Sequence, residues 1–162
     1  MLLAVNFAFI NLPFYEEETY RAVREEIYGY IRRDSYKIFG VEISPKHVQG
    51  AKLNVVSAKV EDAVKIIEGD ATKLEKFMMI APKKVVVNLP YGIRSAKPKV
   101  LSNLYTRFLS SLSKITKGCT IVALTTEKPL FKEAAKEAGI ELIDERWILH
   151  GNLQAYILKC SL

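Results

Sequence analysis

Strand-like and helix-like stretches alternate along this chain of 162 residues, and the alternation restricts the folds it can adopt. We expect strands at residues 37–43, 64–67, 85–87 and 119–125. We expect helices at residues 14–33, 45–57, 71–79, 97–115 and 129–138. This order predicts an α/β fold whose mainly parallel sheet is covered on both faces. The last two strands, 141–146 and 153–160, follow each other without a helix and predict an antiparallel hairpin at the sheet edge.

Size and composition favour one domain over residues 1–162. The chain is 49% hydrophobic, enough for a real core, and has no Gly/Ser linker. Its apolar opening, residues 1–14, is too short to cross a bilayer and lacks the features of a secretory signal, so we expect a cytoplasmic protein. Cys119 and Cys160 lie in predicted strands without metal-site spacing, which indicates buried thiols and no metal.

The strand at residues 85–87 leads directly into Asn88, Leu89, Pro90 and Tyr91. Ligands collect at the carboxyl ends of parallel strands. The Asn88 side chain and the Leu89 carbonyl can accept hydrogen bonds from an exocyclic amine, and Pro90 fixes the backbone. Tyr91 can stack on the ring that carries the amine. The segment therefore predicts a site for a flat, nitrogen-bearing base.

Two acids stand at the ends of earlier strands. At Glu42 a carboxylate can accept both hydroxyls of a ribose, as in other Rossmann-like sites. Asp70 is placed to reach the adenine amine of the same nucleoside, and Ile43 and Ala71 lie beside the two acids. Either acid alone would more often be a helix cap or a surface acid. Their order, followed by Asn88, resembles the order of cofactor ribose, cofactor adenine and target base in methyltransferases.

Positive charge is concentrated around the motif. The net charge is +6, and no acidic residue occurs from Lys76 through Thr126. Such a segment can attract a polyanion to the site and lose that attraction in salt. We expect RNA contacts from Arg94, Lys97 and Lys99. For other lysines, such as the pair at 83–84, a solvated surface is an equal alternative.

The segment at 88–91 resembles the (Asn/Asp)-Pro-Pro-(Tyr/Phe) motif of Rossmann-like amino-methyltransferases, which use S-adenosylmethionine to modify adenine N6 or guanine N2. Leu89 replaces the first proline, and this variant, followed by Gly92, is similar to the THUMP-containing RNA guanine-N2 methyltransferases. The stretches IFGVEISPKHVQG at 38–50 and GDATKL at 69–74 also resemble that family, and the likeness extends over nearly the whole chain.

The resemblance implies an S-adenosylmethionine-dependent RNA methyltransferase with a Rossmann-like sheet, and tRNA guanine N2 as the expected target. The catalytic residues would be Asn88, Leu89, Pro90 and Tyr91. The cofactor-binding residues would be Glu42, Ile43, Asp70, Ala71 and Asn88.

One part of the family pattern is missing. The first strand should end in an Asp-Pro-x-Cys-Gly-Ser-Gly-Thr loop, and the eight glycines of this chain form no such cluster. We therefore expect the first strand to be absent, with apolar sheet edges exposed. The start could be internal, a second chain could supply the THUMP part and the first strand, or the loop could be lost. A less favoured alternative places residues 1–9 in the gap as a makeshift strand.

Two other functions stay open. A relative that keeps the basic face without binding cofactor would be an RNA-binding or regulatory module. An amino-methyltransferase could instead act on DNA adenine or on a protein glutamine. The leucine after Asn88 favours RNA guanine over DNA adenine and protein glutamine.

Overall fold

The computed structural model describes residues 7–30, 37–91 and 98–162, and the chain forms two compact units, Met1–Glu68 and Gly69–Leu162. The predicted α/β class is confirmed: parallel strand pairs occur in both units, and the chain closes with an antiparallel hairpin. The single domain over residues 1–162 stays a prediction. No helix in the described ranges is both long and apolar enough to cross a membrane.

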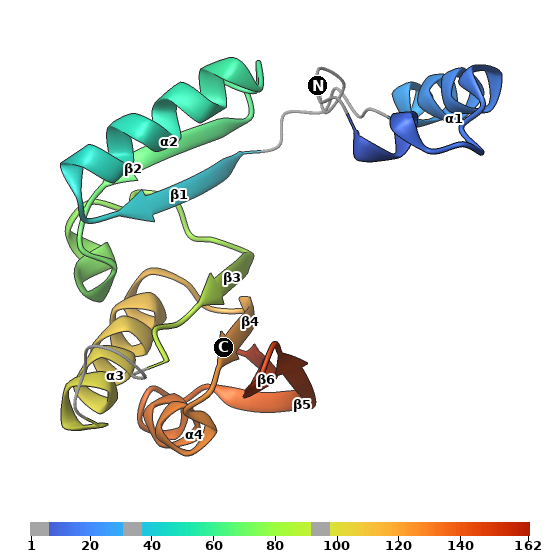
Figure 1. Ribbon diagram of the computed structural model, residues 1–162. Helices are drawn as coiled ribbons and strands as arrows, with labels where there is room; N and C mark the ends of the chain where they lie inside the picture. The colour runs from blue at the N-terminus through green and yellow to red at the C-terminus, as the bar shows by residue number, and fades with distance from the viewer. Residues whose placement is uncertain (1–6, 31–36, 92–97) are drawn as a thin grey trace. The chain divides into compact units, whose positions relative to one another are not determined.

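Unit 1 contains a short 3-10 helix, two α-helices and two strands. In chain order they are η1 (Ala8–Asn11), α1 (Glu17–Gly29), β1 (Ile38–Glu42), α2 (Pro45–Ser57) and β2 (Val64–Glu68). β1 and β2 pair in parallel along their full length, and α2 packs on the pair through its buried Val48 (Figure 1). The makeshift strand at residues 1–9 is not formed at 8–9, which belong to η1, and residues 1–6 lie outside the described ranges.

The helix starts of unit 1 follow the sequence signals in part. Glu17 and Glu18 occupy the first turn of α1, where negative charge is favourable. Pro45 opens α2 as predicted, and Ser44 holds the N-cap position. The Ser44 side chain makes no capping hydrogen bond, and its backbone N–H donates to the Glu42 carboxylate.

Unit 2 contains the four-stranded sheet. Its elements are η2 (Ala71–Lys76), β3 (Lys84–Asn88), α3 (Pro98–Ile115), β4 (Thr120–Thr125), α4 (Lys128–Glu137), β5 (Glu141–His150) and β6 (Leu153–Ser161). The strand order is β3-β4-β6-β5, with β3 parallel to β4 and β6 antiparallel to both of its neighbours. The predicted hairpin is confirmed, with β5 at the edge of the sheet. The helix expected at 71–79 is a 3-10 helix that ends at Lys76.

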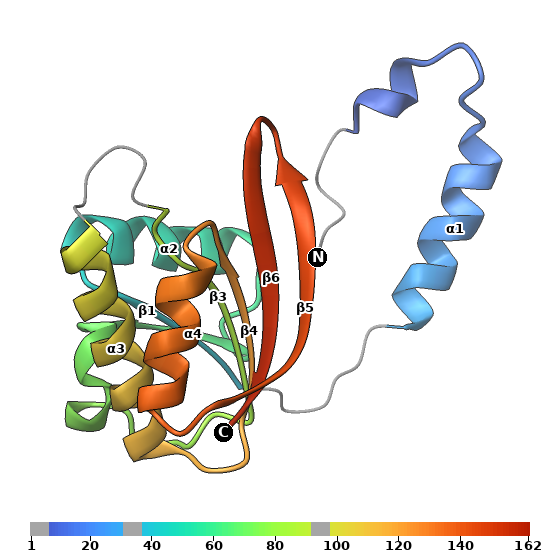
Figure 2. The same cartoon turned by 90° about the horizontal axis from the view of Figure 1, so that it is seen from below.

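The core of unit 2 lies between one face of the sheet and the helices α3 and α4, which run side by side (Figure 2). The Tyr105 ring of α3 meets the Phe131 ring of α4 edge to face, with centroids 6.4 Å apart. Alternate residues of β4 point into this layer, and Ile121, Ala123 and Thr125 are fully buried.

The opposite face of the same sheet is open. Val86, in the middle of β3, is 83% exposed. No described helix of unit 2 packs on this face, because α3 and α4 both contact the side that Thr125 and Tyr156 share. The expectation of helices on both faces concerns the sheet of the whole chain and stays a prediction.

The two cysteines are buried, as the sequence predicts. Cys160 lies in β6, opposite Ile121, and Cys119 directly precedes β4. Burial raises the pKa of both thiols, that of Cys160 to about 11. Both side chains therefore act as small apolar core residues.

Candidate functional site

The carboxyl end of β3 presents the predicted motif beside β4. Asn88 is the last residue of β3 and pairs with Leu124. The Leu89 N–H donates to the Leu124 carbonyl at 2.9 Å, which continues the ladder one residue beyond the strand. The Leu89 side chain is buried, whereas Asn88 and Pro90 are exposed. Leu89 therefore anchors the motif, and its neighbours Asn88 and Pro90 are accessible to solvent.

The side chain of Asn88 already has a partner. The Tyr91 hydroxyl donates a hydrogen bond to Asn88 Oδ1 at 2.6 Å. This oxygen is the one predicted to accept a base amine. This oxygen has two lone pairs, so an incoming amine can bind beside the Tyr91 hydroxyl or replace it, and replacement would release the ring for stacking.

The backbone of the motif is fixed by hydroxyl groups from two other elements. Tyr105 of α3 donates to the Pro90 carbonyl at 2.6 Å, and its hydroxyl lies 3.0 Å from Thr125 Oγ1. Thr126 donates to the Tyr91 carbonyl at 3.2 Å. The Leu89 carbonyl receives no hydrogen bond from any residue that the structure describes. Its role as an acceptor for a base amine stays a prediction.

Tyr105 and Thr125 are the residues that sequence reasoning did not assign to the site. Tyr105 lies on the buried face of α3 with Leu101, Phe108 and Leu112. Burial raises its pKa, so the hydroxyl keeps its proton and remains a donor to Pro90. The sequence signal for this role is the hydroxyl of Tyr105, which stands in a row of otherwise apolar residues at helical spacing.

In unit 1, Glu42 ends β1 with a fixed carboxylate. Its Oε1 accepts from the Ser44 N–H at 2.8 Å and lies 3.8 Å from His47 Nδ1. Within the described ranges, Oε2 has no hydrogen-bond donor. Ile43 beside it is exposed. The end of β1 therefore presents the Oε2 atom of Glu42 and the apolar side chain of Ile43 to a ligand.

In unit 2, Asp70 caps η2. Its Oδ1 accepts from the Thr72 hydroxyl at 2.7 Å and the Thr72 N–H at 2.9 Å, and Oδ2 lies 3.3 Å from Lys73 Nζ. The Thr72 hydroxyl, and then its N–H, hold the pKa of Asp70 below the ordinary value of 3.8. The alternative weighed from sequence, a helix cap, is thus present, and Ala71 is the first residue of that helix.

The predicted RNA contacts can be placed in part. Lys99 is exposed in the first turn of α3. Arg94 and Lys97 lie outside the described residues. Six other basic residues of the acid-free segment are exposed: Lys76, Lys83, Lys84, Arg107, Lys114 and Lys117.

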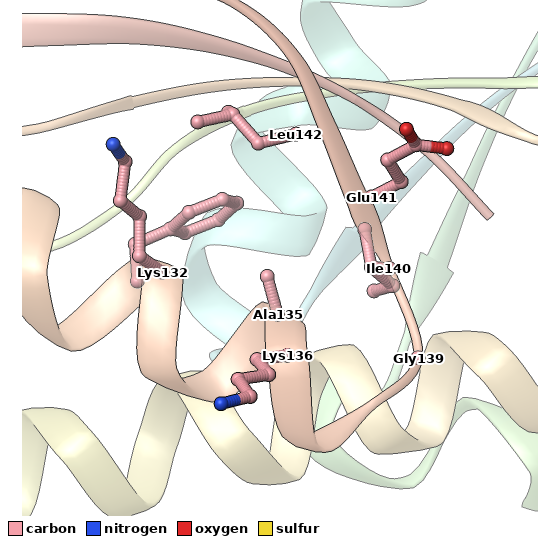
Figure 3. Close-up of a pocket in the computed structure, with 8 residues that line it drawn as sticks. Lys132, Ala135, Lys136, Gly139, Ile140, Glu141 and Leu142 are labelled. Atoms are coloured by element: carbon pink, nitrogen blue, oxygen red, sulfur yellow. The ribbon is translucent and has the colours of Figure 1, made fainter.

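A pocket of about 440 Å³ lies elsewhere in unit 2, between α4 and the start of β5 (Figure 3). Its polar lining groups are Lys132, Lys136 and Glu141. Glu141 pairs with Ser161, which pairs in turn with Thr120 at the start of β4. The pocket is therefore at the end of the sheet opposite Asn88. No group of three or more metal-ligating side chains occurs among the residues described.

Comparison with known proteins agrees with this arrangement. Residues 2–156 match the family UPF0020, described as RMKL-like, methyltransferase domain. The chain is 34% identical over 158 residues to the tRNA (guanine(6)-N2)-methyltransferase of Methanocaldococcus jannaschii, covering 96% of this chain and 40% of that protein. It is 29% identical over 122 residues to the tRNA (guanine(10)-N2)-dimethyltransferase of Pyrococcus abyssi, covering 74% of this chain and 36% of that one.

The fold is also found in solved structures. A crystal structure of SMU.472 complexed with SAH aligns with a TM-score of 0.74 and 22% identity, over 96% of this chain and 40% of that one. This likeness concerns the fold. Because the family match covers nearly the whole sequence, this chain belongs to the RMKL-like methyltransferase domain family.

Proposed function

We propose that this chain is the catalytic domain of an S-adenosylmethionine-dependent RNA methyltransferase that acts on guanine N2 of tRNA in the cytoplasm. The observation that carries the proposal is the motif at the end of β3, in which Asn88 is exposed and the Leu89 carbonyl accepts no hydrogen bond from a described residue, on a backbone held from α3 and β4. The names of the two tRNA relatives support the substrate class.

The chain spans about 40% of the length of the Methanocaldococcus relative. The activity of the whole protein is therefore part of the proposal. We expect residues 1–162 to act as one methyltransferase-like domain that is incomplete at its N-terminal side. A second chain that supplies the remaining part, including the first strand, is one source consistent with this proposal.

The described side chains fit the nucleoside half of the cofactor. The unused Oε2 of Glu42 can accept from a ribose hydroxyl, and the exposed Ile43 offers an apolar surface for a ring. Asp70 fits less well, since both of its oxygens have partners. No glycine cluster is present for the methionine half. We therefore assign Glu42 and Ile43 to the nucleoside and treat Asp70 and Ala71 as the weaker assignment.

Methyl transfer requires the protein mainly to position the cofactor and the target base. S-adenosylmethionine, when bound, supplies an electrophilic methyl group with its own leaving group. Asn88 Oδ1 and the Leu89 carbonyl would accept the two N–H groups of guanine N2, which orients its lone pair and stabilises the positive charge that develops on nitrogen. Tyr91 would leave Asn88 and stack on the base, while Tyr105 keeps Pro90 in place.

Methyl transfer from radiolabelled S-adenosylmethionine to unmodified tRNA, measured with the complete protein, tests the proposal. Asn88→Ala should lower kcat by at least about 100-fold, the usual loss for one preorganised polar group, without changing the thermal unfolding midpoint. Asn103→Ala, at an exposed position of α3, is the matched control. Undiminished methyl incorporation by Asn88→Ala would refute the assignment.

A cofactor-poor RNA-binding relative is the second candidate, favoured by the occupied carboxylate of Asp70. Titration calorimetry with S-adenosylmethionine separates the two. Binding supports the enzyme. No binding by the complete protein, together with retained tRNA affinity, supports the second candidate.

A further inference from the structure

The β5–β6 hairpin reaches past the end of β4 on the side of the candidate site. β4 pairs with β6 only from Tyr156 to Ser161, whereas residues 153–155 of β6 pair with β5 alone. Figure 2 shows the hairpin projecting beyond the sheet. β4 ends at Thr125, whose hydroxyl contacts Tyr105 under the motif. The projecting part therefore stands beside the motif, at the same end of the sheet.

One face of this projection is aromatic and apolar. Thr125 pairs with Tyr156, and Tyr156 pairs with Trp147, so the three side chains point to the same side of the sheet. Leu149, two residues beyond Trp147, continues this face. Trp147 is 55% exposed and Leu149 is 60% exposed. A large ring and a leucine left in water at the rim of a site indicate a surface that another molecule covers.

A lysine fixes the Tyr156 ring in this row. Lys128 Nζ lies 4.5 Å from the ring centroid and 3.1 Å from Glu145 Oε1. Lys132 pairs with the other oxygen of Glu145 at 2.7 Å. Hydrogen bonds from Lys132, and then Lys128, lower the pKa of Glu145, so that acid stays ionised and paired. Two lysines therefore pair with one carboxylate beside the Tyr156 ring.

The separation between this face and the motif suits a polynucleotide. Trp147, Tyr156 and Thr125 occupy neighbouring strands, and Asn88 lies on the next strand beyond β4. At about 4.8 Å between strands, three steps separate Trp147 from Asn88 by about 14 Å in the plane of the sheet. Asn88 is in register with Leu124 and lies on the other face, so an RNA strand that reaches both passes over the carboxyl ends of β3 and β4. A few unpaired nucleotides extend over such a distance. Aromatic rings beside fixed cations stack on unpaired bases irrespective of sequence.

We propose that Trp147, Leu149 and Tyr156 form an RNA-stacking surface that holds an unpaired base of the substrate next to the target nucleotide. This inference depends on the proposed function in one respect, which is that the substrate is RNA. The aromatic row with its fixed lysine favours RNA over a protein partner. Contact between two copies of the chain is an outcome that the experiment can detect.

The experiment measures binding of fluorescein-labelled, unmodified tRNA to the complete protein by anisotropy at fixed salt. Trp147→Leu should raise Kd about 5-fold or more, since one base stacked on an aromatic ring contributes about 1–3 kcal/mol. Trp147→Phe keeps a ring and should stay within about threefold of the parent. Ile143→Ala is the matched control, because Ile143 lies on the same strand and is 54% exposed.

The fluorescence of Trp147, the single tryptophan of the 162 residues, provides a second measurement. Single-stranded RNA should quench its fluorescence more than an RNA duplex of equal length, because duplex bases are already stacked. Equal tRNA affinity of the parent and Trp147→Leu overturns the proposal. So does a Trp147→Leu variant that changes only the sedimentation coefficient, which would assign the face to contact between copies.

The two proposals fail separately. Asn88→Ala should retain the fluorescence response to RNA although methyl transfer is lost. A parent protein that binds RNA through Trp147 but transfers no methyl group would refute the proposed function alone.

Discussion

The Tyr91 hydroxyl donates to Asn88 Oδ1 at 2.6 Å, so the motif satisfies its own polar groups when no base is present. Exposed amides usually find water as a partner instead. Here an internal donor occupies the acceptor that the chemistry requires. Because this oxygen has a second lone pair, a base amine can bind beside the Tyr91 hydroxyl or replace it, and replacement would free the Tyr91 ring to move.

Substitutions at Tyr91 separate the hydroxyl from the ring. Tyr91→Phe removes the internal competitor and keeps the stacking surface, so kcat/KM for tRNA methylation should stay within about threefold of the parent or rise. Tyr91→Ala loses stacking worth about 1–3 kcal/mol and should lower kcat/KM at least about 5-fold. Steady-state methylation assays check both. Equal losses in the two variants would mean that the hydroxyl, and not the ring, serves the reaction.

Tyr105→Phe should destabilise the backbone of the motif, because Tyr105 donates to its Pro90 carbonyl. The substitution leaves the Pro90 carbonyl without its donor and should lower the free energy of unfolding by about 1–2 kcal/mol. Because the motif carbonyls also lose their fixed positions, kcat should fall more than KM changes. Urea unfolding and methylation kinetics measure the two effects. Tyr28→Phe, on the exposed side of α1, is the control and should change neither quantity.

The sequence predicted the order and type of most elements because each has a clear period and clear ends. The α2 helix begins at Pro45 as expected, since proline suits the first helical position. The β5 strand was expected to end at 146 and continues to His150. Its last residues are held by pairing with β6 beyond the edge of the sheet, a long-range contact that local patterns do not encode.

Site residues were predictable where they occupy the carboxyl end of a strand, as Asn88 does. The supporting contacts were not, because they join positions far apart in sequence. Tyr105 meets Pro90 across 15 residues, and no periodicity distinguishes its hydroxyl from a ring buried for packing alone. The cap at Asp70 is local, and sequence reasoning had weighed it as the alternative.

Asp70→Asn separates a capping role from cofactor binding. Asparagine can still accept from Thr72, so the fold should persist, whereas an adenine amine loses one acceptor. We expect weaker S-adenosylmethionine binding by calorimetry with a nearly unchanged melting temperature. Unchanged cofactor affinity would leave Asp70 as a cap only.

The same substitution changes acid stability in a defined direction. The folded pKa of Asp70 is lowered, so its contribution to stability is present above the unfolded pKa of about 4 and is lost as the pH falls through the folded value. Between pH 5 and pH 2 the stability of the parent should therefore fall more than that of Asp70→Asn, by an amount on the order of that for one titrating carboxyl group. Thermal melts across that range measure the difference.

Gly69→Ala should destabilise the turn between β2 and η2. A methyl group there would lie 2.5 Å from the Phe77 ring, so the ring must move, at a cost of about 1–3 kcal/mol. Gly50→Ala, in the middle of α2 with open space around it, should instead stabilise by about 0.5–1 kcal/mol. Chemical unfolding of both variants should show a lower free energy of unfolding for Gly69→Ala and a higher one for Gly50→Ala. Stabilisation by Gly69→Ala would contradict the contact with Phe77.

The two buried thiols act as a kinetic marker for one part of the chain. Unit 1 contains no cysteine, and both thiols belong to unit 2, where Cys160 faces Ile121 across the β4–β6 pairing. A thiol of raised pKa inside a closed core reacts with an alkylating reagent only while that pairing is open. Since the same two strands carry Thr125 and Tyr156, the alkylation rate measures how often the strands beneath the motif separate.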